Sequence, residues 1–400
     1  MYRNYLFKLG EKIQTGDKKH MYTSKKIHIQ TLQLLHKGRH SDIYLDRENF
    51  DKPAVIKILH KNTCSVMQRY KLHRELEISK RIIHNNIREV YGAVVIENRD
   101  SLIMEYIKGR TIYQAFIYKS RGIIDMLNTA IAITRALNNL HTANIAHNCI
   151  TPSNILVSDK DNVIKFIDFG YALNIKNRNE SNFNPEISED SVKYMSPEQT
   201  GKLNMSVDYR TDFYSLGALF YEMFAGVPPF SGESAEETVH YHIAKGPLPI
   251  YKLNPEIPRV LSDIIGKLLS KNAGDRYQSA IGIESDLIKV LNLFINKPKF
   301  QKKGVNQFSL AQDDFYNNLI IPDKLLGREK EIILLTELLK GITTASRPVF
   351  SVIAGFSGVG KSSLVRQFKK SIPEEQSIFI EGKFDQIKSN IPYFAFIKAF

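Results

Sequence analysis

The sequence is poor in cysteine and has no long apolar run. Its 400 residues include only two cysteines, Cys64 and Cys149, which cannot form a disulfide framework. This scarcity suits a reducing compartment, so we expect a cytoplasmic protein. No apolar stretch approaches the roughly 18 residues that a membrane span needs. The basic N-terminus is not followed by the apolar region of a signal peptide, so we expect neither a secreted scaffold nor a membrane span.

Acidic residues are in the minority. The 42 Asp and Glu stand against 55 Lys and Arg, which gives a net charge of +13. The basic residues are scattered rather than clustered, which favours a solvated basic surface over a nucleic-acid or anionic-membrane site. We therefore expect no nucleic-acid partner. The length, with 43% hydrophobic and 24% charged residues, is typical of a globular protein of two or three domains.

The most informative stretch lies between residues 144 and 170. In order, it contains His147, Asn148, Cys149, Asn154, Asp168, Phe169 and Gly170. These residues resemble the catalytic and metal-binding loops of a protein kinase, which usually read H-R-D-L-x-x-x-N and D-F-G. The resemblance implies that Asn154 and Asp168 hold magnesium ions. It also implies that Cys149 occupies the position of the catalytic aspartate, so the match predicts the fold and leaves the activity open.

Segments upstream resemble the nucleotide-binding parts of a kinase. Three β-prone runs occur between residues 32 and 59. Of the three glycines with which kinases approach the phosphates, only Gly38 remains, and a plain hairpin turn explains it as well. Ala54-Val55-Ile56-Lys57 resembles V-A-I-K. The resemblance places Val55 and Lys57 at the nucleotide, with Lys57 on the α- and β-phosphates; the alternative is a solvated strand lysine.

Residues 67–83 carry apolar residues at helical spacing. Within H-R-E-L-E-I we choose Glu75 as the partner of Lys57, because Glu77 faces roughly the opposite side of the helix. The alternative is that both glutamates are surface charges.

Two further strands, at residues 90–95 and 102–104, lead into Met104-Glu105-Tyr106-Ile107. This stretch resembles the hinge between the two lobes of a kinase. The resemblance implies that backbone groups of Glu105 and Ile107 meet adenine.

The downstream half is predicted to be mainly helical. A helix at residues 127–141 precedes the catalytic loop, and helical segments continue to about residue 295. Residues 171–195 are polar, as expected of an activation segment. The resemblance implies that Asp212 ties a helix to the catalytic loop and that Arg276 pairs with Glu198.

A second phosphate-binding motif lies near the end of the sequence. Residues 355–362 read G-F-S-G-V-G-K-S, a full G-x-x-x-x-G-K-S, with a predicted strand at 348–354 before it and a helix after it. The residues that we expect to hold a second nucleotide and its magnesium are Gly355, Gly360, Lys361 and Ser362. A chance glycine-rich turn is the alternative.

The motifs predict an α+β, bilobal protein-kinase-like fold over residues 27–295. We expect a basic extension at 1–26, a linker at 296–326 and, at 327–400, a truncated AAA-type domain that begins an α/β P-loop NTPase fold. Residues 363–400 contain no strand that ends in the acidic residue such an ATPase needs. We therefore expect a fragment or a shortened gene.

Three stretches, at residues 196–217, 355–365 and 382–393, extend the resemblance. They are similar to bacterial multidomain signalling proteins in which a serine/threonine-kinase-like domain precedes an AAA-type P-loop ATPase and then sensor and histidine-kinase domains. The resemblance implies ATP and Mg²⁺ as cofactors and a protein substrate or signalling partner. The family normally has Asp where this chain has Cys149.

Three functions remain open at this point. The first is phosphoryl transfer from ATP to protein Ser or Thr, weak because Cys149 replaces the base. The second is a nucleotide-binding pseudokinase that regulates a partner. The third is the remnant of a shortened gene. Nothing in the sequence indicates an oligomeric state.

Overall fold

The computed structural model describes most of the first three quarters of the chain and parts of the rest. The described residues are 27–61, 65–82, 84–117, 122–175, 191–202, 205, 207–296, 308–315, 327–345, 349–354, 361, 364, 365 and 368. The chain divides into two compact units, Met1–Tyr316 and Asn317–Phe400. Among the described helices, none combines the length and the apolar composition that crossing a bilayer requires.

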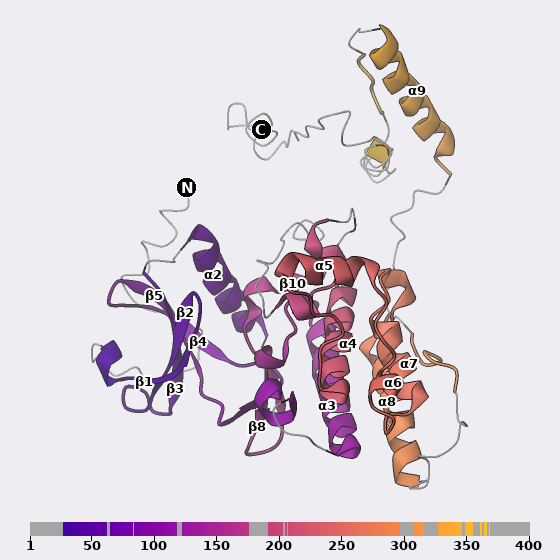
Figure 1. Cartoon of the computed structure of the whole chain (residues 1–400). Helices are drawn as coiled ribbons and strands as arrows, with labels where there is room; N and C mark the ends of the chain where they lie inside the picture. Colours follow the sequence, from indigo (N-terminus) through magenta and orange to yellow (C-terminus); the bar gives the residue numbers. More distant parts are fainter. Residues whose placement is uncertain are drawn as a thin grey trace. The chain divides into compact units, whose positions relative to one another are not determined.

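An antiparallel five-stranded sheet forms the first lobe of the first unit, in the order β1-β2-β3-β5-β4 (Figure 1). Helix α2 packs against β4 and β5, and the hydroxyl of its N-cap Ser65 accepts from the Gln68 N–H. The short helix η2 precedes the sheet. The bounds of these elements are η2 Ile29–Thr31, β1 Gln33–Lys37, β2 Ser41–Asp46, β3 Ala54–Leu59, α2 Val66–Arg81, β4 Val90–Ile96 and β5 Arg99–Glu105.

Strand β3 lies at the centre of this sheet and is apolar on both faces. Ile56 and Ile58 are buried in a cluster on one face, whereas Val55 and Leu59 are buried in a second cluster. Lys57 alternates with these residues and therefore shares the face of Val55 and Leu59. A lysine in such a strand needs anionic partners, because burying an unpaired charge is costly.

The second lobe is mainly helical, as the sequence predicts. The expected helix at 127–141 is α3, and the predicted strand before Asp168 is β9. The elements of this lobe are β6 Gly109–Thr111, η3 Tyr113–Ile117, α3 Ile123–Thr142, β7 Ile145–Ala146, η4 Pro152–Asn154, β8 Ile155–Ser158, β9 Ile164–Phe166, η5 Phe169–Tyr171, β10 Leu173–Asn174, η7 Val192–Tyr194, η8 Pro197–Thr200, α4 Arg210–Ala225, α5 Ala235–Ala244, α6 Ile250–Leu253, α7 Arg259–Leu268, η9 Ala273–Asp275 and α8 Ala280–Asn296.

Helix α4 is the centre of the helical lobe. Its residues 211–224 are all buried, as expected of a helix surrounded by others on every side. Gly217 permits a close approach of α4 to α7, because a Cβ there would lie 2.7 Å from the Cβ of Leu268. The buried first turn of α4 carries Asp212, which places a carboxylate inside the lobe.

Residues 308–315, which we call the docked segment, return to α8. The carboxylate of Asp314 accepts hydrogen bonds from the Gln278 N–H, the Ser279 N–H and the Ser279 hydroxyl, all at 2.7 Å. Asp313 accepts from the Ser285 hydroxyl at 2.7 Å and from Lys289 at 2.9 Å. These residues lie within the stretch 296–326 that the sequence predicts to be a linker. Their contacts are with residues more than 20 positions earlier in the chain, so no local periodicity in the sequence indicates them.

The second unit is described in part. The predicted helix near 331–339 is α9, Glu329–Ala345. Residues 349–354 form no strand, contrary to the prediction, and Phe350 and Val352 are exposed. A strand exists only when a neighbour pairs with it, and the described residues of this unit include no such neighbour. Lys361 has a helical conformation, whereas Gly355, Gly360 and Ser362 lie outside the described residues.

Candidate functional site

Three charged side chains from distant parts of the chain meet beside the sheet. The Nζ of Lys57 on β3 lies 2.8 Å from Oε2 of Glu75 on α2. The same Nζ lies 3.1 Å from Oδ1 of Asp168, which follows β9. The structure therefore brings together the lysine, glutamate and aspartate that the sequence singles out. Glu77, the rejected alternative, instead faces Arg74 at 3.8 Å.

The ionisation of these groups follows from their contacts. Burial acts to lower the pKa of Lys57, but the carboxylates of Asp168 and Glu75 outweigh it and raise that pKa. Burial acts to raise the pKa of Asp168, but Lys57 outweighs it and the net shift is downward. Lys57 and Asp168 are therefore charged near neutral pH. The Asp168 side chain is 44% exposed, so it is accessible to a ligand.

The backbone around Asp168 fixes the direction of its carboxylate. Asp168 has a left-handed conformation, with φ of 64°. Phe169, immediately after it, is buried in the helical core. The N–H of Ile167 donates to the carbonyl of Asn154 at 3.0 Å, which joins the two predicted metal-binding residues through adjacent backbone. Carboxylate and amide oxygens are the ligand types that Mg²⁺ prefers.

Cys149 lies beside Asn154 in the loop between β7 and η4. The Asn154 side-chain amide donates to the Cys149 carbonyl at 2.9 Å and lies 3.7 Å from its sulfur. Burial, reinforced by the negative charge of Asp168, raises the pKa of the Cys149 thiol to about 12. The thiol is therefore neutral near pH 7. A neutral thiol is a poor proton acceptor, so the structure places no effective base at this position.

Asp212 holds the loop from within the helical lobe. Its buried carboxylate accepts from the backbone N–H groups of His147 at 2.8 Å and Asn148 at 2.7 Å. It also lies 2.9 Å from Nε2 of His141 at the end of α3. The role that the sequence suggested for Asp212 thus agrees with its contacts.

Asn148 joins three segments through neutral hydrogen bonds. Its amide nitrogen donates to the Tyr171 carbonyl at 3.2 Å. Its side-chain oxygen accepts from the Gln199 side-chain amide at 2.8 Å, and the same amide donates to the Asn148 carbonyl. Sequence reasoning did not single out Gln199. Its position directly after Ser196-Pro197-Glu198 was the available signal.

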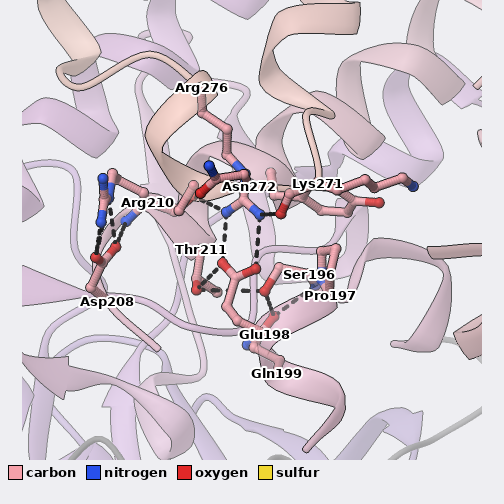
Figure 2. Close-up of polar contacts among 12 residues, drawn as sticks. Ser196, Pro197, Glu198, Gln199, Asp208, Arg210, Thr211, Lys271, Asn272 and Arg276 are labelled. Atoms are coloured by element: carbon pink, nitrogen blue, oxygen red, sulfur yellow. Dashed lines mark hydrogen bonds and ion pairs between the residues drawn. The ribbon is translucent and has the colours of Figure 1, made fainter. Parts of the chain in front are cut away.

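Glu198 and Arg276 form a completely buried ion pair, shown in Figure 2. The two guanidinium nitrogens donate to the two carboxylate oxygens at 2.6 and 2.8 Å. The Thr211 hydroxyl donates to Glu198 at 2.8 Å, and carbonyls of Ser270 and Lys271 accept from Arg276. This pair fixes η8, and thereby Gln199, against the helical lobe.

The remaining predicted nucleotide-binding residues line the same sheet. Val55 and Met104 are buried partners across β3 and β5. The Glu105 N–H donates to the Glu89 carbonyl, and its carboxylate pairs with Lys165. Ile107 lies between β5 and β6, and within the described part of the chain its N–H and carbonyl have no backbone hydrogen-bond partner.

Gly38 belongs to the turn between β1 and β2. Its N–H donates to the Ser41 carbonyl at 3.1 Å, and a Cβ would lie 2.5 Å from that oxygen. The hairpin turn alone therefore requires a glycine at this position, so Gly38 by itself does not indicate a phosphate-binding loop.

The comparisons with known proteins agree with this geometry. Residues 29–287 match the family model of the protein kinase domain, and residues 324–400 match that of the AAA ATPase domain. A hybrid signal transduction histidine kinase G of Dictyostelium discoideum is 35% identical over 54% of this chain and 7% of its own length.

Two bacterial kinases are also similar. A probable serine/threonine-protein kinase of Clostridium perfringens is 32% identical over 65% of this chain and 38% of its own length. Serine/threonine-protein kinase PknB of Mycolicibacterium smegmatis is 29% identical over 64% and 42%, respectively. The matched regions thus span less than half of these relatives.

The kinase match covers more than half of the sequence, and its range includes Lys57, Glu75 and Asp168. By this evidence the chain belongs to the protein kinase family, with a bilobal kinase domain followed by residues that match the AAA ATPase domain.

Proposed function

We propose that the first unit binds magnesium-ATP and transfers its terminal phosphoryl group slowly to serine or threonine of a protein. The observation that carries this proposal is the simultaneous contact of Lys57 with Glu75 and Asp168. Kinases need this lysine–glutamate pair and the metal-binding aspartate together for catalysis. The names of the bacterial relatives support serine and threonine as acceptors.

In this proposal each side chain has a separate task. Lys57 binds the α- and β-phosphates, while Glu75 holds it in position. Val55 and the backbone of Glu105 and Ile107 contact the adenine, and the turn at Gly38 lies over the phosphates. Asn154 and Asp168 would hold Mg²⁺. Bound magnesium neutralises charge on the phosphates, which is much of what phosphoryl transfer requires.

We propose a low rate because of Cys149. Transfer passes through a loose transition state, in which positioning and charge neutralisation do most of the work. A positioned general base typically adds about 10²- to 10⁴-fold. The neutral thiol supplies little of this, but the positioning groups remain in place.

A second candidate is a pseudokinase that binds nucleotide and presents a surface to a signalling partner. The raised pKa of Cys149 favours it, because binding needs no base. Measurable transfer of labelled phosphate to a generic basic protein distinguishes the two. We also propose that the second unit binds its own nucleotide through Gly355, Gly360, Lys361 and Ser362, since this part matches the AAA ATPase domain.

Thermal unfolding of the full chain with and without ATP and Mg²⁺ tests nucleotide binding by the first unit. Lys361→Ala serves as the background, because it removes the predicted second site. We expect nucleotide to raise the melting temperature of this background and Asp168→Ala to abolish the rise. Asp161→Ala, an exposed aspartate between β8 and β9, should keep it. The absence of any rise in the Lys361→Ala chain would refute the proposal.

A further inference from the structure

Arg88 is a buried cation next to the site that the chemistry above does not use. It lies in the connection between α2 and β4, and its side chain is only 9% exposed. Its Nη2 lies 3.7 Å from Oε1 of Glu75. Glu75 thus has a cation at each oxygen, with Lys57 at Oε2 and Arg88 at Oε1.

The backbone of Arg88 is fixed to β9, the strand that precedes Asp168. Its N–H donates to the Phe166 carbonyl at 3.1 Å, and Ile87 forms a β-bridge with Phe166. On the other side, the Phe166 N–H donates to the Asn86 carbonyl at 2.8 Å. Arg88 therefore connects β9 to α2 through one side chain.

The charges explain why a second cation is useful here. The Glu75 side chain is 2% exposed, and an uncompensated carboxylate in such a place is costly. Lys57 is shared between Glu75 and Asp168 before any ligand arrives. A bound polyphosphate would be a third anionic partner of the same ammonium group. Burial lowers the pKa of Arg88, and the negative charge of the neighbouring Glu75 opposes that shift.

We propose that Arg88 is a positioning residue that compensates Glu75 while Lys57 binds the phosphates of ATP. By this means α2 keeps its place against β9 in both the free and the nucleotide-bound states. The inference rests on the proposed nucleotide binding and adds the residue that makes the lysine available for it. The sequence signal was weak, because Arg88 lies in the mostly polar residues before β4.

A double-mutant cycle on magnesium-ATP affinity tests the proposal. Isothermal titration of the full chain, in the Lys361→Ala background that removes the predicted second site, compares Arg88→Met, Glu75→Gln and the double variant. We expect Arg88→Met to weaken binding about fivefold or more, and to change it less than about twofold once Glu75 is neutral. Arg99→Met is the matched control, because Arg99 lies in the same lobe but pairs with Glu97. It should bind as the background does.

Each outcome decides a different point. No binding by the Lys361→Ala chain refutes the proposed function itself. Binding by that chain with unchanged affinity in Arg88→Met overturns only the role of Arg88, as do additive effects of the two substitutions. Melting without nucleotide identifies variants that do not fold. If Arg88→Met fails to fold, Arg88→Lys replaces it in the cycle: coupling to Glu75→Gln supports the role, and additivity overturns it.

Discussion

The two sides of the site differ in how they use charge. On the side proposed for the nucleotide, Lys57 contacts both Glu75 and Asp168, and the Asp168 side chain is half-exposed. On the side proposed for the acceptor, Cys149 is neutral near pH 7, and the Asn148 side chain makes neutral hydrogen bonds with Tyr171 and Gln199. The side proposed for the nucleotide therefore carries a lysine between two carboxylates, whereas the side proposed for the acceptor lacks an effective base.

Charge on the acceptor side serves stability instead. Glu198 and Arg276 satisfy each other completely inside the protein and present nothing to a ligand (Figure 2). A site with one intact side and one altered side implies that binding and transfer can be separated by mutation. The experiments that follow test this separation.

The largest expected effect is on transfer. Cys149→Asp should raise the rate of phosphoryl transfer by about 10²- to 10⁴-fold, because it supplies a carboxylate where the acceptor hydroxyl arrives. Affinity for magnesium-ATP should change little. Transfer of labelled phosphate at saturating ATP measures the first quantity, and titration measures the second.

Cys149→Asn is the control for shape without basicity, and it should leave the rate near that of the parent. A variant Cys149→Asp that binds ATP but gains no rate would contradict slow catalysis and favour the pseudokinase.

Breaking the buried pair should affect stability. Glu198→Ala leaves the Arg276 guanidinium buried without its anion, which typically costs about 3–5 kcal/mol of unfolding free energy. Asp208→Ala breaks the neighbouring, partly exposed pair with Arg210, which is worth about 1 kcal/mol or less. Denaturant unfolding compares the two. Equal losses would show that the burial of Glu198 and Arg276 does not set their contribution.

A smaller effect is expected from a negative charge in the activation segment. Kinases switched by phosphorylation pair the phosphate with an arginine that precedes the catalytic aspartate; Asn148 stands there and cannot form an ion pair. Ser191→Asp should therefore change the transfer rate less than about threefold. Two further serines of this segment, Ser181 and Ser188, could also carry a phosphate, but they lie outside the described residues. A gain in transfer rate well beyond threefold would show that a cation elsewhere in the protein pairs with the new carboxylate.

The smallest effect is the response to pH. Because the pKa of Cys149 is raised to about 12, its thiol stays protonated from pH 7 to 9. The parent rate should change less than about twofold over this range, and Cys149→Ala should have the same profile. A Cys149-dependent rise of about tenfold per pH unit would show that the thiolate acts as the base.

The anchors on the nucleotide side could be predicted because each interrupts a regular pattern. Lys57 is the polar residue of an apolar strand, and Asp168 follows another strand within a recognisable motif. The choice of Glu75 over Glu77 followed from helical geometry and agrees with the contacts. Local periodicity and motif spacing thus account for most of the kinase fold and for the charged centre of its site.

What the sequence did not indicate depends on contacts between distant residues. Arg88 faces Glu75 across a turn of irregular backbone, and Gln199 reaches Asn148 from another segment. The strand expected at 348–354 was inferred from apolar composition alone, which does not provide the neighbour that a strand needs. The neutrality of Cys149 likewise follows from its surroundings rather than from its identity.

The docked segment gives the kinase unit a mechanical anchor for the chain that leaves it. A pull on the residues after 315 is borne first by Asp314, whose bonds end on Gln278 and Ser279. These residues directly follow Arg276 and Tyr277. Arg276 forms an ion pair with Glu198, which precedes Gln199 in the chain. A force applied where the chain leaves this unit therefore acts close to the Glu198–Arg276 pair, rather than at the C-terminal end of α8.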